Sequence, residues 1–175
     1  EFVPLPQRTA IANQENADLF LSIHANAHQT PSVRGVETYF LNFATNMGAA
    51  AVAARENAAS GQTMGALPDI VRAIALNNKL DESRNLATQV QRALAEKLKT
   101  TNKGVRDMGV KQAPFLVLIG AAMPSVLAEV SFITNPTDAK LLQTENHRQR
   151  IAEALFTAVR RYQNSLKNVT TIAQQ

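Results

Sequence analysis

The sequence of 175 residues contains no cysteine, which excludes a disulfide framework and any metal site built on thiolates. Aromatic residues make up only 5% of the chain and do not alternate with basic ones, which argues against a nucleic-acid-binding face. No apolar run approaches the ~20 residues of a membrane-spanning helix. A Gly-rich phosphate loop and a Gly-x-Ser-x-Gly turn are also missing, so neither common signature of nucleotide binding or serine hydrolysis is present.

The remaining composition is that of one folded domain. With 45% hydrophobic and 18% charged residues, the chain can bury a real core without disulfide bonds. The net charge of +4 favours anionic partners such as acidic wall polymers, but lysine and arginine are scattered singly, as on an ordinary solvated surface. We expect a domain over residues 1–166 and a polar tail over 167–175. The chain starts at Glu1 without methionine or signal peptide, so we interpret it as a piece of a longer protein.

The order of hydrophobic patterns predicts a single α/β domain with helices on both faces of a sheet. Strands are expected at 18–24, 36–41, 115–119 and 125–130. Helices are expected at 4–16, 46–60, 67–78 and 81–100, and from Thr144 onward. The first helix should turn Ile11 and Ala12 inward. Asn135 followed by Pro136 is typical of the start of a further helix.

His24 is one of three histidines and the best placed for chemistry. It ends an apolar strand, and small residues follow it. In open α/β sheets, binding sites form beyond the carboxyl ends of strands, so His24 is a candidate metal ligand or base. On position alone, a hydrogen-bonded structural histidine is the simpler interpretation. His28 lies in a polar loop, and His147 is expected to be exposed in the first turn of the last helix.

Glu129 is the other anomaly, because it lies in the otherwise apolar run MPSVLAEVSFI. Carboxylates are seldom buried unless paired, and burial would raise the pKa of Glu129 towards the range that suits a general base. The alternative is a structural salt bridge to Arg106 or Lys111. A catalytic zinc needs about three protein ligands and a water, so these residues alone do not complete a site.

Several segments resemble the zinc-dependent N-acetylmuramoyl-L-alanine amidases of bacterial cell-wall turnover and daughter-cell separation. They are FVPLPQRTAIAN (2–13), ADLFLSIHANA (17–27), RGVETYFL (34–41), AARENA (53–58), LDESRNLA (80–87) and the two blocks GVKQAPFLVL and MPSVLAEVSFITNP within 109–136. They follow the family order and cover nearly the whole chain.

The resemblance implies a zinc-exopeptidase-like fold, a mixed, mostly parallel sheet flanked by helices on both faces. It implies that His24 is a zinc ligand and that Glu129 is the catalytic carboxylate. The substrate would be peptidoglycan, cut between N-acetylmuramic acid and L-alanine in the periplasm or outside the cell. A protein activator is a further partner that the family suggests, whereas nucleic acid and a membrane span are not expected.

The chain departs from the family pattern in its metal ligands. The family's first ligand histidine and a ligand glutamate would both precede Glu1, so we expect the remaining ligands upstream. If residues 1–175 bound zinc tightly by themselves, His28 and Glu37 would be the next candidates. Some relatives carry a helix that plugs the zinc site. The corresponding region 42–80 is compact, so we expect no plug here, although Glu56 could still reach a metal.

Two other functions remain open at this point. One is a catalytically inactive relative that binds peptidoglycan with the same fold. The other is a zinc exopeptidase, which its cleavage products would distinguish from an amidase.

Overall fold

The computed structural model describes residues 2–58, 71–72 and 74–172, with side chains through Leu166. Its strands are β1 (Phe20–Asn26), β2 (Val36–Leu41), β3 (Asp107–Ala113) and β4 (Ser125–Phe132). Its helices are α1 (Leu5–Gln14), α2 (Met47–Ala58), α4 (Leu80–Lys99), α5 (Pro136–Leu142) and α6 (Glu145–Ile172), with a short 3-10 helix η2 (Leu116–Leu118). Part of the helix expected over 67–78 lies outside the described residues, and 71–72 and 74–75 are helical.

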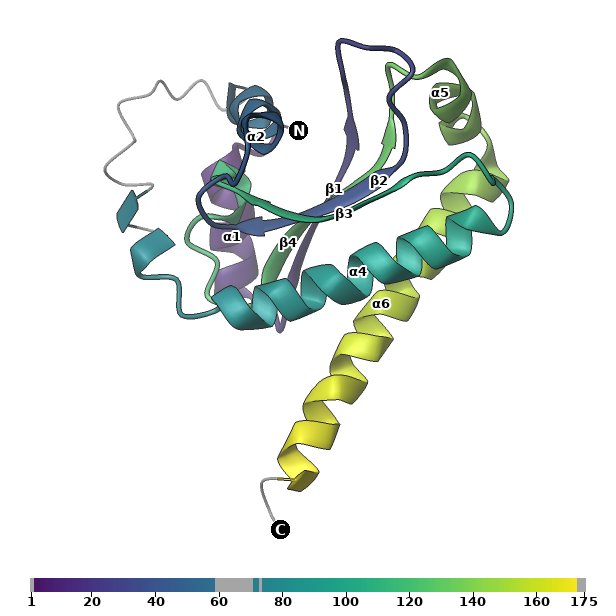
Figure 1. The fold of residues 1–175 in the computed structure, drawn as a ribbon. Coiled ribbons are helices and arrows are strands. Elements are labelled where there is room, and N and C mark those ends of the chain that lie inside the picture. The colour runs from purple at the N-terminus through teal and green to yellow at the C-terminus, as the bar shows by residue number, and fades with distance from the viewer. Residues whose placement is uncertain (1, 59–70, 73, 173–175) are drawn as a thin grey trace.

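Within the described residues, the strands form one mixed sheet in the order β1-β4-β2-β3. The β1–β4 and β2–β3 pairs are parallel, whereas the central β4–β2 pair is antiparallel. Figure 1 shows this sheet in the middle of the molecule, with α4 and α6 running beneath it. The expected mixed, mostly parallel sheet is therefore confirmed.

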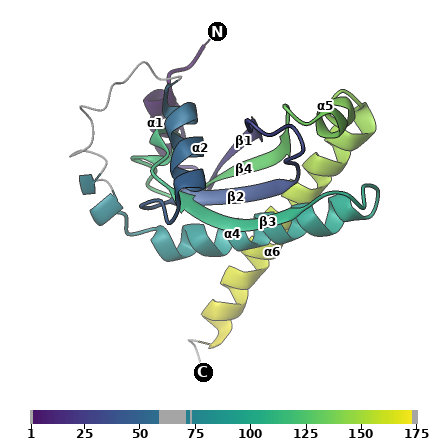
Figure 2. The ribbon, with the colours of Figure 1, turned by 45° about the horizontal axis from the view of Figure 1, so that its top comes forward.

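Helices cover both faces of the sheet, as expected. Side chains alternate between the two faces of a strand, which separates two apolar clusters. On one face, Phe40 and Val126 pack with residues of α4 and α6. On the other, Tyr39 and Leu127 pack with residues of α1, α2 and η2. Figure 2 shows α1 and α2 on the opposite side of the sheet from α4.

Three elements agree closely with the sequence pattern. Helix α4 buries the apolar residues that recur every four positions along it, so one stripe faces the sheet. Asn135 begins α5, because its side chain accepts hydrogen bonds from the backbone amides of Thr137 and Asp138, both at 3.1 Å. Thr144 also caps α6, since its hydroxyl accepts from the backbone amide of His147 at 3.4 Å.

The expectation of a strand over 115–119 is wrong. This apolar run forms η2 and its extended flanks, buried in the cluster on the α1 and α2 side. An uninterrupted apolar run indicates burial and does not by itself specify a strand. The fourth strand is instead β3, whose more polar sequence DMGVKQA lies at the edge of the sheet and is only partly buried.

Two smaller expectations are also wrong, and the last helix extends into the segment expected to be a polar tail. Ile11 is 50% exposed, and α1 turns Leu5 and Thr9 inward instead. The Thr9 hydroxyl donates to the carbonyl of Ile119 at 3.1 Å, which ties α1 to the segment after η2. His147 is 6% exposed where exposure was expected, and burial lowers the pKa of its imidazole. Helix α6 continues to residue 172, so much of the expected tail has a helical backbone.

None of the helices among the described residues combines the length and the apolar character that crossing a membrane requires.

Candidate metal and catalytic site

The strand register brings three polar side chains into one row across the sheet. His24 on β1 pairs with Glu129 on β4, and Glu129 pairs in turn with Glu37 on β2. Paired residues of neighbouring strands project to the same face, here the face that α1 and α2 cover. The row lies towards the carboxyl ends of the parallel strands β1 and β4, where sites in α/β sheets form.

Helix α2 adds another carboxylate to this row. Ala53 is buried against the sheet, and Glu56 follows about one turn later on the same side of the helix. Asn57 fixes the end of α2, because its amide donates to the carbonyl of Pro114 at 2.9 Å and accepts from the backbone amide of Leu116 at 2.8 Å. The segment before η2 therefore holds Glu56 over the sheet.

Both ring nitrogens of His24 have partners. Its Nδ1 lies 2.7 Å from Oε2 of Glu56, and its Nε2 lies 3.0 Å from Oγ of Ser22. The hydrogen bond from His24 lowers the pKa of the Glu56 carboxyl, so the carboxylate form is favoured there. Contacts on both sides of the ring fix its plane, as a metal ligand requires.

The carboxyl group of Glu129 is fully buried and unpaired. Its exposed fraction is 0%, and neither oxygen has a hydrogen-bond partner among the described residues. Burial raises the pKa of Glu129 to about 8, helped by the negative charges of Glu56 and Glu37 and opposed by Arg55. The salt bridge to Lys111 considered above is not formed, because Lys111 pairs with Glu37. A buried carboxyl without a partner is costly, which points to a ligand or a reaction that uses it.

His24, Glu56 and Glu129 could hold a metal ion together. Their ligand atoms all lie within 4.8 Å of one another. Imidazole nitrogen and carboxylate oxygen are donors that zinc accepts in proteins, and the unpaired oxygens of Glu129 are groups that a cation would satisfy. The residues therefore fit a divalent cation of this kind. Glu56 was considered able to reach a metal, and in the structure it contacts His24 from α2. Residues 59–70, part of the region where no plug is expected, lie outside the described residues.

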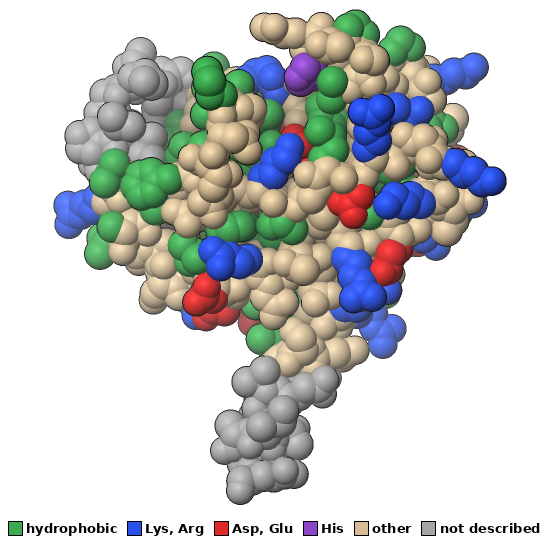
Figure 3. All heavy atoms as spheres, viewed as in Figure 1, with side chains coloured by type: hydrophobic (Ala, Val, Ile, Leu, Met, Phe, Trp, Pro, Cys, Tyr) green, Lys and Arg blue, Asp and Glu red, His purple; other side chains and the backbone are tan. Residues whose placement is uncertain are grey.

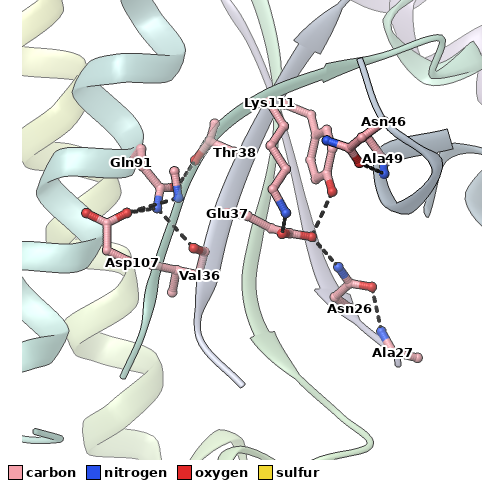
Figure 4. A network of polar contacts seen from close by, with 12 residues as sticks. Asn26, Ala27, Val36, Glu37, Thr38, Asn46, Ala49, Gln91, Asp107 and Lys111 are labelled. Carbon is pink, nitrogen blue, oxygen red and sulfur yellow. Dashed lines mark hydrogen bonds and ion pairs between the residues drawn. The ribbon is translucent and has the colours of Figure 1, made fainter. Parts of the chain in front are cut away.

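Glu37 lies in the same row but is already satisfied. Its Oε1 accepts hydrogen bonds from the Tyr39 hydroxyl at 2.8 Å and from the Asn26 amide at 2.6 Å, and its Oε2 pairs with Lys111. Figure 4 shows this chain of contacts from Lys111 through Glu37 to Asn26. Neither Glu37 nor the exposed His28 belongs to the candidate metal cluster.

Two residues of the site, Ser22 and Asn26, were not identified from the sequence, although their spacing on β1 indicates their position. Ser22 and Asn26 alternate with apolar residues on β1, two positions before and after His24. In a strand, this spacing puts all three on one face. Such a polar stripe on a strand that is otherwise apolar marks the surface on which the site is built.

Comparison with known protein sequences identifies a family. The family model for N-acetylmuramoyl-L-alanine amidase matches residues 1–161. The amidase AmiC of Neisseria meningitidis serogroup B is 33% identical over 172 residues, which cover 94% of this chain and 40% of that protein. The amidase AmiA of Escherichia coli K12 is 32% identical over 169 residues, which cover 92% of this chain and 57% of that protein.

A solved structure agrees with these sequence relatives. The N-acetylmuramoyl-L-alanine amidase from Clostridium difficile 630 matches with a TM-score of 0.65 at 25% identity, over 94% of this chain and 67% of that one. The chain thus spans 40% and 57% of the length of the two relatives above, and the family model matches it over residues 1–161. By sequence and by fold, this chain belongs to the N-acetylmuramoyl-L-alanine amidase family.

Proposed function

We propose that the protein is a zinc-dependent hydrolase that cuts the amide bond between N-acetylmuramic acid and L-alanine in peptidoglycan, in cell-wall turnover or daughter-cell separation. The observation that carries this proposal is the buried carboxyl of Glu129, which lies beside His24 and Glu56 and has no hydrogen-bond partner among the residues that the structure describes. Family membership supports the class of substrate, and the arrangement of these three side chains supports the type of reaction.

His24 is the residue that would hold the zinc most directly, with carboxylate oxygen available beside it. The resemblance described above predicts further ligands upstream of Glu1. Bound zinc would supply a water with a pKa of about 7 and would draw charge from the scissile amide oxygen. His24 suits this role because Ser22 and the sheet fix the direction of its ring.

Glu129 would carry the proton. It would accept a proton from the attacking water and deliver it to the leaving nitrogen, so that the carbon–nitrogen bond breaks as a carbon–oxygen bond forms. Burial suits the carboxyl to this task, because a pKa raised to about 8 makes Glu129 a stronger base than an exposed glutamate. The products would be a free lactyl carboxylate on muramic acid and a stem peptide with a free amino terminus.

The place of action follows from the substrate, since peptidoglycan lies outside the cytoplasmic membrane. We therefore infer a periplasmic or extracellular protein. Basic and acidic side chains are interspersed on the face that Figure 3 shows, as expected for a solvated surface.

The CwlD amidase from Clostridioides difficile has been solved in complex with the GerS lipoprotein. By analogy, we propose that a protein partner acts on α2 of this chain.

The test uses the full-length protein, purified peptidoglycan and a metal assay. We expect one zinc per domain and the release of intact stem peptides, and His24→Ala should lose most of the zinc. Glu129→Gln should keep the fold and the zinc but reduce release by about 10²- to 10⁴-fold, because glutamine cannot carry the proton.

The two alternative functions, an inactive wall-binding protein and an exopeptidase, predict different results in the same experiment. An inactive wall-binding relative would bind peptidoglycan and release nothing. An exopeptidase would release single amino acids. A Glu129→Gln protein that melts much earlier, yet still releases stem peptides at the wild-type rate per folded molecule, would make Glu129 a structural residue.

A further inference from the structure

Arg55 lies beside the candidate site and forms no ion pair within the described part of the chain. It is an exposed residue of α2, next to Glu56 in the sequence. Its Nη2 donates to Oδ1 of Asn26 at 2.5 Å. Among the described residues Arg55 forms no ion pair, whereas Arg34, Arg92 and Arg161 each pair with a carboxylate. The acceptor that holds Arg55 is neutral, so its positive charge remains available to a ligand.

Hydrogen bonds fix the side-chain amide of Asn26 with its oxygen directed at Arg55. Its Oδ1 also accepts from the backbone amide of Ala27 at 2.7 Å, and its Nδ2 donates to Glu37 at 2.6 Å. The exposed fraction of Asn26 is 1%. An amide fixed at both ends cannot rotate without breaking several buried hydrogen bonds. It therefore presents one acceptor in a constant position to the guanidinium group.

The buried ion pair beneath Asn26 explains why a carboxylate does not bind Arg55 directly. Glu37 forms an ion pair with Lys111, and its other oxygen accepts a hydrogen bond from the Tyr39 hydroxyl. Glu37 is therefore committed to Lys111, Tyr39 and Asn26, and it forms no ion pair with Arg55. Asn26 thus links Arg55 to the buried hydrogen-bond network around Glu37. Because Asn26 is neutral, it does not cancel the positive charge of the guanidinium group.

Arg55 also lies close to the proposed catalytic groups. Its charge acts on the carboxyls of both Glu56 and Glu129. Both carboxyls belong to the cluster within 4.8 Å that includes His24. A guanidinium group presents a planar fork of N–H donors that matches a carboxylate. Stem peptides of peptidoglycan carry such carboxylates near the bond that the proposed reaction breaks.

We propose that Arg55 binds a carboxylate of the stem peptide and so positions the substrate over the site. This inference rests on the proposed function for its substrate class. Asn26, Glu37 and Lys111 are positioning residues that hold Arg55 and do not touch the substrate.

The test compares two soluble muropeptides in the full-length protein, one with free stem carboxylates and one with those carboxylates amidated. Arg55→Gln should raise the KM for the free form by roughly ten- to hundred-fold, the range of one charge-assisted hydrogen-bonding contact, with little change in kcat. The amidated form should be used poorly by the wild type and equally poorly by the variant. Arg55→Lys should restore part of the preference, and the matched control Arg92→Gln should behave as wild type, because Arg92 pairs with Glu96 on the surface of α4.

Calorimetric binding of both muropeptides to Glu129→Gln protein, with and without Arg55→Gln, separates this inference from the proposed function. Arg55-dependent preference for free carboxylates supports the inference even if the wild type releases no stem peptide. An equal effect of Arg55→Gln on both muropeptides, or a fall in kcat alone, would overturn it. The first result would indicate a structural role, and the second would indicate that Arg55 acts on the reacting carbonyl.

Discussion

The buried carboxyl of Glu129 should make the free energy of unfolding of the metal-free protein depend on pH. The pKa of this group rises from 4.5 to about 8 on folding, so between these values the folded chain holds a proton that the unfolded chain has lost. The free energy of unfolding should therefore fall as pH rises through this window, by at most about 1.4 kcal/mol per pH unit from this group. Below pH 4.5, both states are protonated and the penalty disappears.

Glu129→Gln removes this titration. After chelation of metal, urea unfolding at several pH values should show the variant gaining stability relative to wild type from pH 4.5 to pH 8. Equal pH profiles for the two proteins would mean that Glu129 is hydrated or paired in solution, contrary to its burial here.

At the scale of single residues, the sequence identified His24 and Glu129 because each breaks a pattern. A histidine at a strand end and an acid in an apolar run are local signals. Glu56 and Arg55 give no such signal, since both lie in an ordinary surface-like stretch of α2. Their positions depend on how α2 packs on the sheet, which involves contacts with residues 114 and 116, far away in the sequence.

At the scale of elements, α2 is the part that could control the site. A catalytic zinc keeps one position open for water, and Glu56 contacts His24 within the cluster that could hold the metal. We expect Glu56→Ala in the full-length protein to retain zinc and to release stem peptides several-fold faster. Zinc content and release rate measured on the same samples check this. A variant that loses zinc and activity together would show that Glu56 is a required ligand.

The strands show where local sequence is sufficient and where it is not. β2 and β4 lie inside the sheet and are apolar or β-branched, so both were predicted from their composition. β3 is an edge strand with polar residues, and its pairing with β2 comes from tertiary contacts that composition does not report. The same limit explains why the apolar run over 115–119 was assigned to a strand.

At the scale of the whole molecule, the sheet separates a supporting core from the core next to the site. Leu94 packs on the α4 and α6 side, and Leu127 packs on the α1 and α2 side, two residues before Glu129. Leu94→Ala and Leu127→Ala should each lower the free energy of unfolding by ~2–5 kcal/mol, because both side chains are fully buried. Only Leu127→Ala should also reduce the release rate per folded molecule. Chemical unfolding and peptidoglycan assays on the pair check this, and equal release rates would argue against the separation.

The strand order has one further consequence. β4 is hydrogen-bonded on both edges, to β1 and to β2, so Glu129 cannot shift without breaking two ladders. A helix packed on a sheet, in contrast, can move away without breaking any backbone hydrogen bond between the strands. The energy needed to uncover the site is therefore set by the contacts of α2, those of Asn57 with residues 114 and 116 and those of Arg55 and Glu56 with β1. The hydrogen bonds between the strands do not have to break. Under the proposed function, substitutions confined to α2 would therefore change how readily the site is uncovered, while the two ladders keep Glu129 in place.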